Sequence, residues 1–324
     1  MEQKKSQYVQ QWQRAVADGL GYRCYTQSVE DESGRIQGVL PLVLVSTRLF
    51  GKMLVSLPYT NSAGVIADND VAASDLVDQA IDLAESLDVD HLQLRQEVPV
   101  LNERLNCGVT DKVLMRLPLP ENAASLWESF KPKVRNQVRK GERCELTIDW
   151  GNEELLPDFY RVFARNMRDL GTPVYGKRLF RSILRTFGTD AELCVVRKQG
   201  QAVAAALLVH GPHGTEVPSA SSLRAYNSIN ANMFMYWQLL KRAVERGCGQ
   251  FDFGRSTDGS NTYRFKKQWG AVPCDSVWQY HVRRGSVLDT RPNGPKFRLA
   301  IQLWKKLPVS VASLIGPRII RGIP

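Results

Sequence analysis

The feature that most constrains the fold of this chain is an approximate internal repeat. Residues 34–95 read in order as a buried strand, a second extended stretch, a helix and a closing strand. Residues 200–255 repeat that order, and their closing strand lies at Phe251–Arg255. Two such units predict duplicated α/β domains with mixed sheets. The length of 324 residues also suits two domains better than one core.

The helix of each copy carries an apolar face with the three- and four-residue spacing of an amphipathic helix. In the first copy this face consists of Leu76, Ala80, Leu83, Ala84 and Leu87. In the second copy it consists of Met233, Tyr236, Trp237, Leu240, Ala243 and Val244. Gly247 follows the second helix, at the position where a glycine commonly ends a helix.

Composition marks two boundaries along the chain. Leu117–Pro120 reads Leu-Pro-Leu-Pro and predicts an extended linker, because proline disfavours helix in the residue before it. Beyond about residue 285 another linker, Thr290–Pro295, leads into a basic segment. We therefore expect an N-terminal domain at 1–118, a second domain at 119–285 and a basic amphipathic tail at 286–324.

The tail begins with an expected helix over Lys296–Leu307. One face of this helix consists of Phe297, Ala300, Ile301 and Trp304. Two interpretations stay open for it. The face docks on the protein's own core, or the basic helix attaches to an anionic membrane surface.

Composition narrows the class of protein. The net charge of +10 favours anionic partners such as nucleic acid, phosphorylated carriers or acidic membranes, although a solvated basic surface explains it equally well. Six scattered cysteines and four histidines argue for reduced thiols and against a zinc site. The N-terminus has no apolar signal-peptide core, and no run of about 18 apolar residues occurs. We expect a cytoplasmic protein without a metal or bound prosthetic group.

Several familiar catalytic signatures are absent from the sequence. It has no Walker loop, HExxH helix, GxGxxG loop or GxSxG elbow. The Gln/Arg-x-x-Gly-x-Gly/Ala loop that binds the acetyl-CoA pyrophosphate in ordinary GNAT enzymes is also missing, and Glu245–Gln250 is only superficially similar to it.

The densest candidate site is Phe251–Gly270, where a strand leads into a small polar loop and then into a cationic, aromatic stretch. Polar groups converge on ligands in loops at strand ends. Lys266 in this stretch can hold an anionic donor or stabilise a developing oxyanion. We expect a strand here, on which Arg264 and Lys266 share a face. The alternative is a surface turn with solvated lysines.

Two further segments are candidates. Glu216–Asn227 combines a carboxylate, several hydroxyls, Arg224 and Tyr226, of which capping of the next helix explains only one or two. Lys131–Arg143 contains six cationic residues. It is either a solvated helix face or a contact for phosphate or RNA. It lacks interleaved aromatic residues, which disfavours a specific role on single-stranded RNA.

Five stretches of the chain resemble a known family. The matching stretches are Arg165–Tyr175, Glu216–Pro218, Ala220–Arg224, Phe251–Thr257 and Thr262–Ala271. On them the chain resembles the FemAB-related family, specifically its group associated with exosortase (PEP-CTERM) systems of exopolysaccharide-producing bacteria. The resemblance covers nearly the whole chain and is most specific over residues 161–281. Two departures are Ser219, where a bulky aromatic is expected, and Asn261, where glycine is expected.

The resemblance implies two tandem GNAT domains that transfer an activated acyl or aminoacyl group to an amine. The implied acceptor is an amino sugar or lipid-linked glycan of the cell envelope. The chain lacks the long helical-hairpin insertion of some tRNA-dependent members, which leaves the donor open among aminoacyl-tRNA, acyl-CoA and acyl carrier protein. The pair Phe265-Lys266 resembles the family's Phe-Lys motif, which implies transition-state stabilisation by Lys266.

The expected site consists of catalytic residues, substrate-binding residues and residues that contact the donor. The catalytic residues are Lys266 together with Asp252 and Glu216, either of which can accept the amine proton. The substrate-binding residues are Arg165, Asn166, Tyr175, Ser221, Ser222, Arg224, Tyr226, Asn227, Arg255, Ser256, Thr257, Tyr263, Arg264, Lys267 and Trp269. The residues that contact the phosphates of the donor are Lys133, Arg135 and Arg139.

Two other functions stay open. One is a non-catalytic module that binds RNA or glycan on a degenerate GNAT fold, which the charge and the missing acetyl-CoA loop allow. The other is a membrane-docked assembly factor for polysaccharide export, in which the tail matters most. The cluster of Asp252, Arg255, Tyr263 and Lys266 favours the enzyme.

Overall fold

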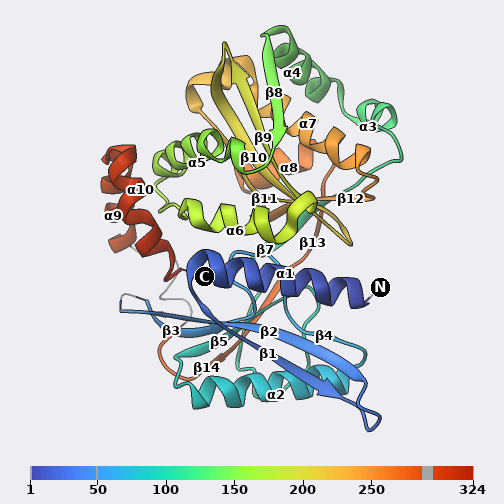
Figure 1. The fold of residues 1–324 in the computed structure, drawn as a ribbon, viewed down its shortest axis with the longest axis vertical. Coiled ribbons are helices and arrows are strands. Elements are labelled where there is room, and N and C mark those ends of the chain that lie inside the picture. The colour runs from blue at the N-terminus through green and yellow to red at the C-terminus, as the bar shows by residue number, and fades with distance from the viewer. Residues whose placement is uncertain (1, 49, 287–294, 324) are drawn as a thin grey trace. The chain divides into compact units, whose positions relative to one another are not determined.

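The computed structural model describes residues 2–48, 50–286 and 295–323 (Figure 1). The chain forms two compact units. Unit 1 contains Met1–Lys112, Asp275–Ile301 and Pro317–Pro324, and unit 2 contains Val113–Cys274 and Gln302–Gly316. The expected boundary at 118 lies close to the end of the first segment. The expected second domain and tail differ from these units, because the chain returns to unit 1 after residue 274.

Unit 1 is a mixed sheet with two helices. The helices are α1 (Glu2–Leu20) and α2 (Asp70–Ser86). The strands are β1 (Arg23–Glu30), β2 (Ile36–Thr47), β3 (Gly51–Val55), β4 (Ile66–Ala67), β5 (His91–Gln96), β6 (Cys107–Val109) and β14 (Val277–Val282). The strand order is β1-β2-β3-β5-β14-β6, and β4 pairs with β2. Only β3 and β5 are parallel among these pairs, and the connection between them contains α2.

The two helices lie on opposite faces of this sheet (Figure 1). Helix α2 begins at Asn69, whose side-chain oxygen accepts a hydrogen bond from the Ala72 amide at 2.9 Å. Its predicted apolar face is confirmed, because Leu76, Ala80 and Ala84 are fully buried against the strands. This face covers one side of the sheet and excludes water from the core of unit 1.

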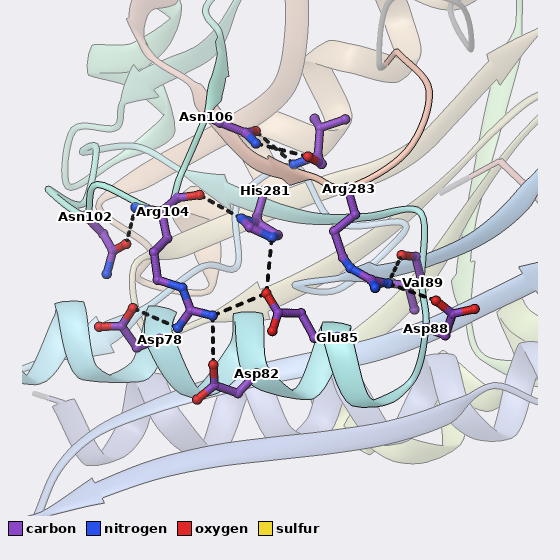
Figure 2. Close-up of polar contacts among 11 residues, drawn as sticks. Asp78, Asp82, Glu85, Asp88, Val89, Asn102, Arg104, Asn106, His281 and Arg283 are labelled. Carbon is purple, nitrogen blue, oxygen red and sulfur yellow. Dashed lines mark hydrogen bonds and ion pairs between the residues drawn. The ribbon is translucent and has the colours of Figure 1, made fainter.

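Strand β14 belongs to unit 1 although it follows unit 2 in the sequence. It pairs antiparallel with β5 on one side and with β6 on the other. Polar contacts fix it in this place (Figure 2). Nδ1 of His281 donates to the Arg104 carbonyl at 2.7 Å, and Arg104 pairs with Asp82 on α2 at 2.8 Å. Asn106 exchanges two hydrogen bonds with the backbone of Val282.

Unit 2 is a second mixed sheet covered by helices. Its helices are α3 (Ala123–Ser129), α4 (Pro132–Arg143), α5 (Leu156–Leu170), α6 (Lys177–Phe187), α7 (Ala231–Glu245) and α8 (Asn261–Gln268), with short 3-10 turns at Glu153–Leu155, Gly188–Asp190 and Arg224–Ile229. Its strands are β7 (Lys112–Pro118), β8 (Leu146–Gly151), β9 (Ala191–Lys198), β10 (Gln201–Gly211), β11 (Gly214–Ser222), β12 (Gln250–Thr257) and β13 (Val272–Asp275). The strand order is β13-β7-β12-β11-β10-β9-β8.

Strand β10 lies near the centre of this sheet, and residues 202–210 of it are all buried. A continuous apolar run such as this one is typical of a strand covered on both faces. Helices α5 and α6 cover one face, and α4 and α7 cover the other (Figure 1). The predicted repeat is thereby confirmed, because β10, β11, α7 and β12 follow the order of β2, β3, α2 and β5.

The tail forms two helices, α9 (Pro295–Lys306) and α10 (Val309–Ile320). In the part of the tail that belongs to unit 2, Trp304 is 9% exposed and Ala312 is fully buried. The tail therefore docks on the protein through Trp304. In contrast, Leu299 and Leu303 on the same helix are 66% and 58% exposed. Among the described residues, no helix is long and apolar enough to cross a membrane.

Candidate active site

The candidate site lies where two neighbouring parallel strands of unit 2 stop pairing. Strands β11 and β12 are paired only at Thr215 with Phe251 and at Glu216 with Asp252. Their remaining residues, up to Ser222 and Thr257, are not paired with each other. The facing edges of these two strands are therefore not joined in a continuous ladder beyond this point.

Glu216 and Asp252 occupy the paired position just before the strands separate. Residues in register on adjacent strands present their side chains to the same face, so both carboxylates lie on one side of the sheet. One oxygen of Asp252 lies 3.1 Å from Nε of Arg116 on β7. The other accepts a hydrogen bond from the Gly254 amide at 2.6 Å. Both Asp252 oxygens are thus engaged, and the carboxylate is held in one orientation.

Lys266 lies on α8 and not on a strand, so the expected strand over residues 264–267 is wrong. Ser260 caps this helix by accepting a hydrogen bond from the Tyr263 amide at 3.2 Å. On a helix, residues two apart point to nearly opposite sides. Lys266 is accordingly buried, whereas Arg264 and Lys267 are exposed. The expected shared face of Arg264 and Lys266 does not exist.

The ammonium group of Lys266 reaches the bend in β12. It donates hydrogen bonds to the carbonyl oxygens of Gly254 and Arg255, each at 2.9 Å. Gly254 has φ +75°, a left-handed conformation that a side chain would strain. Burial lowers the pKa of Lys266 to about 8, although the negative charge of Asp252 opposes this shift. A desolvated cation close to a carboxylate is thus built into this part of unit 2.

Two buried hydroxyls at the carboxyl ends of the separating strands lack partners. The side-chain oxygens of Ser222 on β11 and Ser256 on β12 have no hydrogen-bond partner in the described part of the chain. Ser256 is only 4% exposed. An unpaired buried hydroxyl costs free energy unless another group, such as a ligand, satisfies it. Both residues were expected to bind substrate.

Several other expected site residues lie along α5 and the turn after β11. Asn166 on α5 donates to the Ser221 hydroxyl at 3.2 Å, which ties this helix to β11. Arg224 reaches the Asp169 carbonyl at 3.4 Å, and the Tyr226 hydroxyl donates to the side chain of Gln201 at 3.0 Å. The Tyr175 carbonyl accepts a hydrogen bond from Tyr160. Arg165, Asn227 and Thr257 are exposed, and Arg255 is half-buried.

The aromatic residues expected near Lys266 divide into two groups. Trp269 is 1% exposed and packs edge-to-face on Phe130, with ring centroids 5.2 Å apart. It is therefore part of the core of unit 2. Tyr263 is half-buried, and Nζ of Lys267 lies 5.5 Å from the centre of its ring. Lys267 thus lies on the exposed side of α8, whereas Lys266 lies on its buried side.

The expected donor-phosphate residues lie on α4, which packs on α7. Lys133 and Arg139 are exposed, Arg135 is half-buried, and the guanidinium of Arg139 lies 5.6 Å from the centre of the Trp127 ring. A Cβ at Gly141 would lie 2.8 Å from Cβ of Phe234, so glycine permits the close helix contact. This contact places the end of α4 beside the first turns of α7.

Two polar groups in unit 2 were not predicted from the sequence. Arg116, which pairs with Asp252, is a charged residue within the apolar alternation of β7, a signal that could have marked it as a candidate. A buried network surrounds Glu192, which accepts two hydrogen bonds from Arg242 at 2.9 and 2.8 Å. Burial raises the pKa of Glu192, but hydrogen bonds from His210 and Arg242 outweigh it and lower the pKa to about 2.

Comparison with known proteins agrees with this geometry. Residues 128–267, which run from the end of α3 to α8, match the family model described as the acetyltransferase (GNAT) domain. No curated protein sequence matches the chain significantly. The described residues contain no group of side chains that could hold a metal ion.

Solved structures of low sequence identity share the fold over most of the chain. FemX is 15% identical with a TM-score of 0.65, and the match covers 94% of this chain and 98% of FemX. L-PGS from Bacillus licheniformis is 12% identical with a TM-score of 0.57, covering 92% and 97%. A tandem GNAT protein from the clavulanic acid biosynthesis pathway is 10% identical with a TM-score of 0.51, covering 88% and 96%.

Residues 128–267 thus match a GNAT acetyltransferase domain, and the fold of the chain is similar to that of FemX. The fold is a FemAB-like tandem GNAT fold, in which two α/β units follow one another in a single polypeptide. The fold expected from the internal repeat and from the family resemblance is therefore confirmed.

Proposed function

We propose that this protein transfers an acyl or aminoacyl group from an activated donor to an amine at the end of the β11–β12 pairing. One observation carries the proposal. Glu216 and Asp252 stand in register where the two parallel strands of the GNAT domain stop pairing, and Lys266 contacts the bend of β12 two residues after Asp252. Buried unpaired hydroxyls at Ser222 and Ser256 add groups that a substrate can satisfy.

The proposed reaction forms one bond and breaks another. The amine nitrogen attacks the acyl carbonyl carbon, and negative charge develops on the carbonyl oxygen. When the new C–N bond is complete, the bond from carbon to the donor's sulfur or oxygen breaks and the donor leaves as a thiol or hydroxyl. A fixed cation that is already desolvated stabilises this developing charge more than it stabilises the neutral substrate. Lys266 has these properties.

The attacking amine must lose a proton during this step. Asp252 holds Arg116 and the Gly254 amide, and it lies two residues before the first carbonyl that Lys266 contacts. We assign it the role of positioning the bend of β12 and supporting the charge of Lys266. Glu216 lies beside it on β11 and is the carboxylate that we propose accepts the proton.

The donor that we propose is an acyl-CoA, an acyl carrier protein or an aminoacyl-tRNA, all of which carry phosphate. Helix α7 begins next to β11, and its N-cap residue Asn230 makes no side-chain capping bond. Amides at the start of a helix attract anions. The contact of Gly141 with this end of α7 brings the cationic helix α4 beside it. Lys133, Arg135 and Arg139 on α4 are the residues we propose for the outer phosphates.

For the acceptor we propose an amine on a sugar or lipid-linked glycan of the cell envelope. The residues that resemble the exosortase-associated FemAB group support this choice, most of all Phe251–Thr257 and Thr262–Ala271. The FemX and L-PGS folds are compatible with it. An acceptor of this kind would be processed at the cytoplasmic face of the membrane, and the exposed leucines of α9 suit peripheral contact with that surface.

A transfer assay tests the proposal. Purified protein is incubated with labelled acyl-CoA, acyl carrier protein and aminoacyl-tRNA pools, each with a set of amino sugars and lipid-linked glycans. We expect label to move to one acceptor class, and we expect Lys266→Met to abolish most of this transfer while Lys267→Met retains it. If the folded protein binds donor or acceptor but transfers label from none of the three pools, it is a binding module and the proposal is wrong.

A further inference from the structure

Unit 1 contains a pocket with a strongly cationic lining. Its volume is about 510 Å³, within the range of roughly 300–1,000 Å³ found for small-molecule sites. Arg23, Lys52, Arg318 and Arg321 line it together with Tyr22 and Ser46. These residues come from the start of β1, the β2–β3 hairpin and the end of α10, so the pocket joins three separate parts of the chain.

The four cations of this pocket are not neutralised by carboxylates. No acidic side chain of the described residues lines the pocket, and none forms an ion pair with these four cations. Asp90 lies at the same hairpin, but it accepts the Lys52 amide and pairs with Arg284 at 3.1 Å. Like charges that share one pocket repel each other and create a positive potential that attracts anions.

The chain holds these charges together by specific contacts. The Tyr22 hydroxyl donates to the Arg321 carbonyl at 2.6 Å, which fixes the C-terminal turn to the start of β1. A Cβ at Gly322 would overlap the ring of Phe50, so the turn packs closely on the hairpin. Lys52 donates its ammonium to the carbonyl of Leu87 at the end of α2. The cationic lining is thus maintained by the fold against its own repulsion.

We propose that this pocket is a second ligand site, which binds the phosphate or diphosphate group of a phosphorylated solute or lipid headgroup. One carboxylate would leave most of the four positive charges uncompensated, whereas a phosphate or diphosphate carries two or more negative charges. Arginine forks bind phosphate oxygens in pairs, and Tyr22 and Ser46 add hydroxyls. The site lies wholly in unit 1, whereas the proposed transfer residues belong to unit 2. Binding at this site is therefore a function additional to the proposed transfer.

Calorimetric titration of the full chain with inorganic pyrophosphate tests the site. The pocket variant is Arg23→Gln with Arg321→Gln, and the control is Arg14→Gln with Arg35→Gln. The control removes the same charge from side chains of unit 1 that are 79% and 73% exposed and paired elsewhere. We expect the pocket variant to bind pyrophosphate about tenfold or more weakly and the control to match the parent. Gly322→Val keeps every charge but displaces the turn, and it should also weaken binding.

Sedimentation with phosphatidylcholine vesicles, with and without phosphatidic acid, separates the two sources of phosphate, because phosphatidic acid carries a phosphate monoester. Pocket-dependent binding of pyrophosphate without pocket-dependent binding to vesicles identifies a phosphorylated solute. Pocket-dependent binding to vesicles that contain phosphatidic acid identifies a lipid headgroup. The inference is overturned if the parent binds neither probe, or if the pocket and control variants behave alike. Both measurements are of binding, so their failure leaves the transfer reaction of unit 2 untouched.

Discussion

The ammonium nitrogen of Lys266 lies 2.9 Å from the carbonyl oxygen of Gly254 and donates a hydrogen bond to it. The bond joins α8 to the bend of β12 immediately after Asp252. Lys266 therefore combines two roles that the sequence alone does not separate. It holds the shape of the strand, and it places a cation where the β11–β12 pairing has ended.

The first prediction concerns the charge of Lys266. Lys266→Met retains most of the stem but removes the cation and leaves two carbonyls without this donor. We expect transfer to fall about a hundredfold or more, as when one oxyanion donor is lost. We also expect stability to fall by about 1–3 kcal/mol, measured by urea unfolding. Lys267→Met is the matched control on the exposed side of α8, and it should match the parent in both measurements.

The second prediction concerns pH. The pKa of Lys266 is lowered to about 8, so the group is cationic below that pH and neutral above it. If the cation stabilises the transition state, the single-turnover rate falls as pH rises through about 8. In Lys266→Met this limb should disappear from the profile. A rate that instead rises through the same pH in the parent, and no longer does so in Lys266→Met, would identify the neutral amine of Lys266 as a base and contradict the assignment to the oxyanion.

The third prediction concerns donor binding by α4. Replacing Lys133, Arg135 and Arg139 with alanine should weaken binding of tRNA or CoA most at low salt. Each lost phosphate contact should lower the salt slope by about 1. The control replaces Arg178, Arg181 and Arg185 on α6, all of which are exposed. Equal slopes for the parent and the α4 variant would remove α4 from the donor site.

The fourth prediction concerns Cys248. Hydrogen bonding to His210 lowers the pKa of the Cys248 thiol although burial opposes it, whereas burial raises the pKa of Cys24 to about 11. Burial also raises the pKa of Cys194. The thiolate is the reactive form, so iodoacetamide at pH 7.5 should label Cys248 well before the other two.

The partner of Cys248 supplies the control for this labelling. Nε2 of His210 lies 2.9 Å from Glu192, and its Nδ1 lies 2.9 Å from the hydroxyl of Thr215. His210→Gln should slow the labelling of Cys248 and leave Cys24 unchanged, as followed by peptide mass spectrometry. Labelling of Cys24 or Cys194 ahead of Cys248 in the parent would refute this arrangement.

The fifth prediction concerns the tail. Leu299 and Leu303 are exposed one turn apart on α9, and Lys305 and Lys306 follow them. Apolar residues beside cations favour an anionic membrane surface. Replacing both leucines with serine should reduce co-sedimentation with phosphatidylglycerol vesicles but leave the melting temperature unchanged, because neither side chain is in the core. The same partition for parent and variant would leave the tail with only its docking role through Trp304.

Local patterns predicted the repeating elements well. The apolar faces of α2 and α7 and the continuous run of β10 depend on spacing within one segment, which the sequence shows directly. The helix around Lys266 was missed because Ser260 was read as part of a polar loop rather than as an N-cap. Its Arg-Phe-Lys-Lys segment alternates like a strand over four residues, which is too short to distinguish the two structures.

Local patterns of this kind could not predict the contacts that join distant segments. Nothing near Arg116 indicates that its partner is Asp252, and nothing near Glu216 indicates that it stands in register with the same residue. The family motif identified Lys266, Asp252 and Glu216 as candidate catalytic residues, but it did not show that Lys266 binds backbone carbonyls. The register between strands that are distant in the sequence is known only from the folded sheet.

The position of β14 also sets the order in which the protein can be completed during synthesis. The strand lies between β5 and β6, yet all of residues 113–274 are translated before it. When β6 leaves the ribosome, its partner has not yet been made, so the nascent first unit exposes an open sheet edge. Unit 2, whose strands are nearly contiguous in the sequence, can fold while that edge remains unpaired. A stalled or truncated chain that ends before residue 277 would thus be a target for chaperones and proteases, even though its GNAT domain is intact.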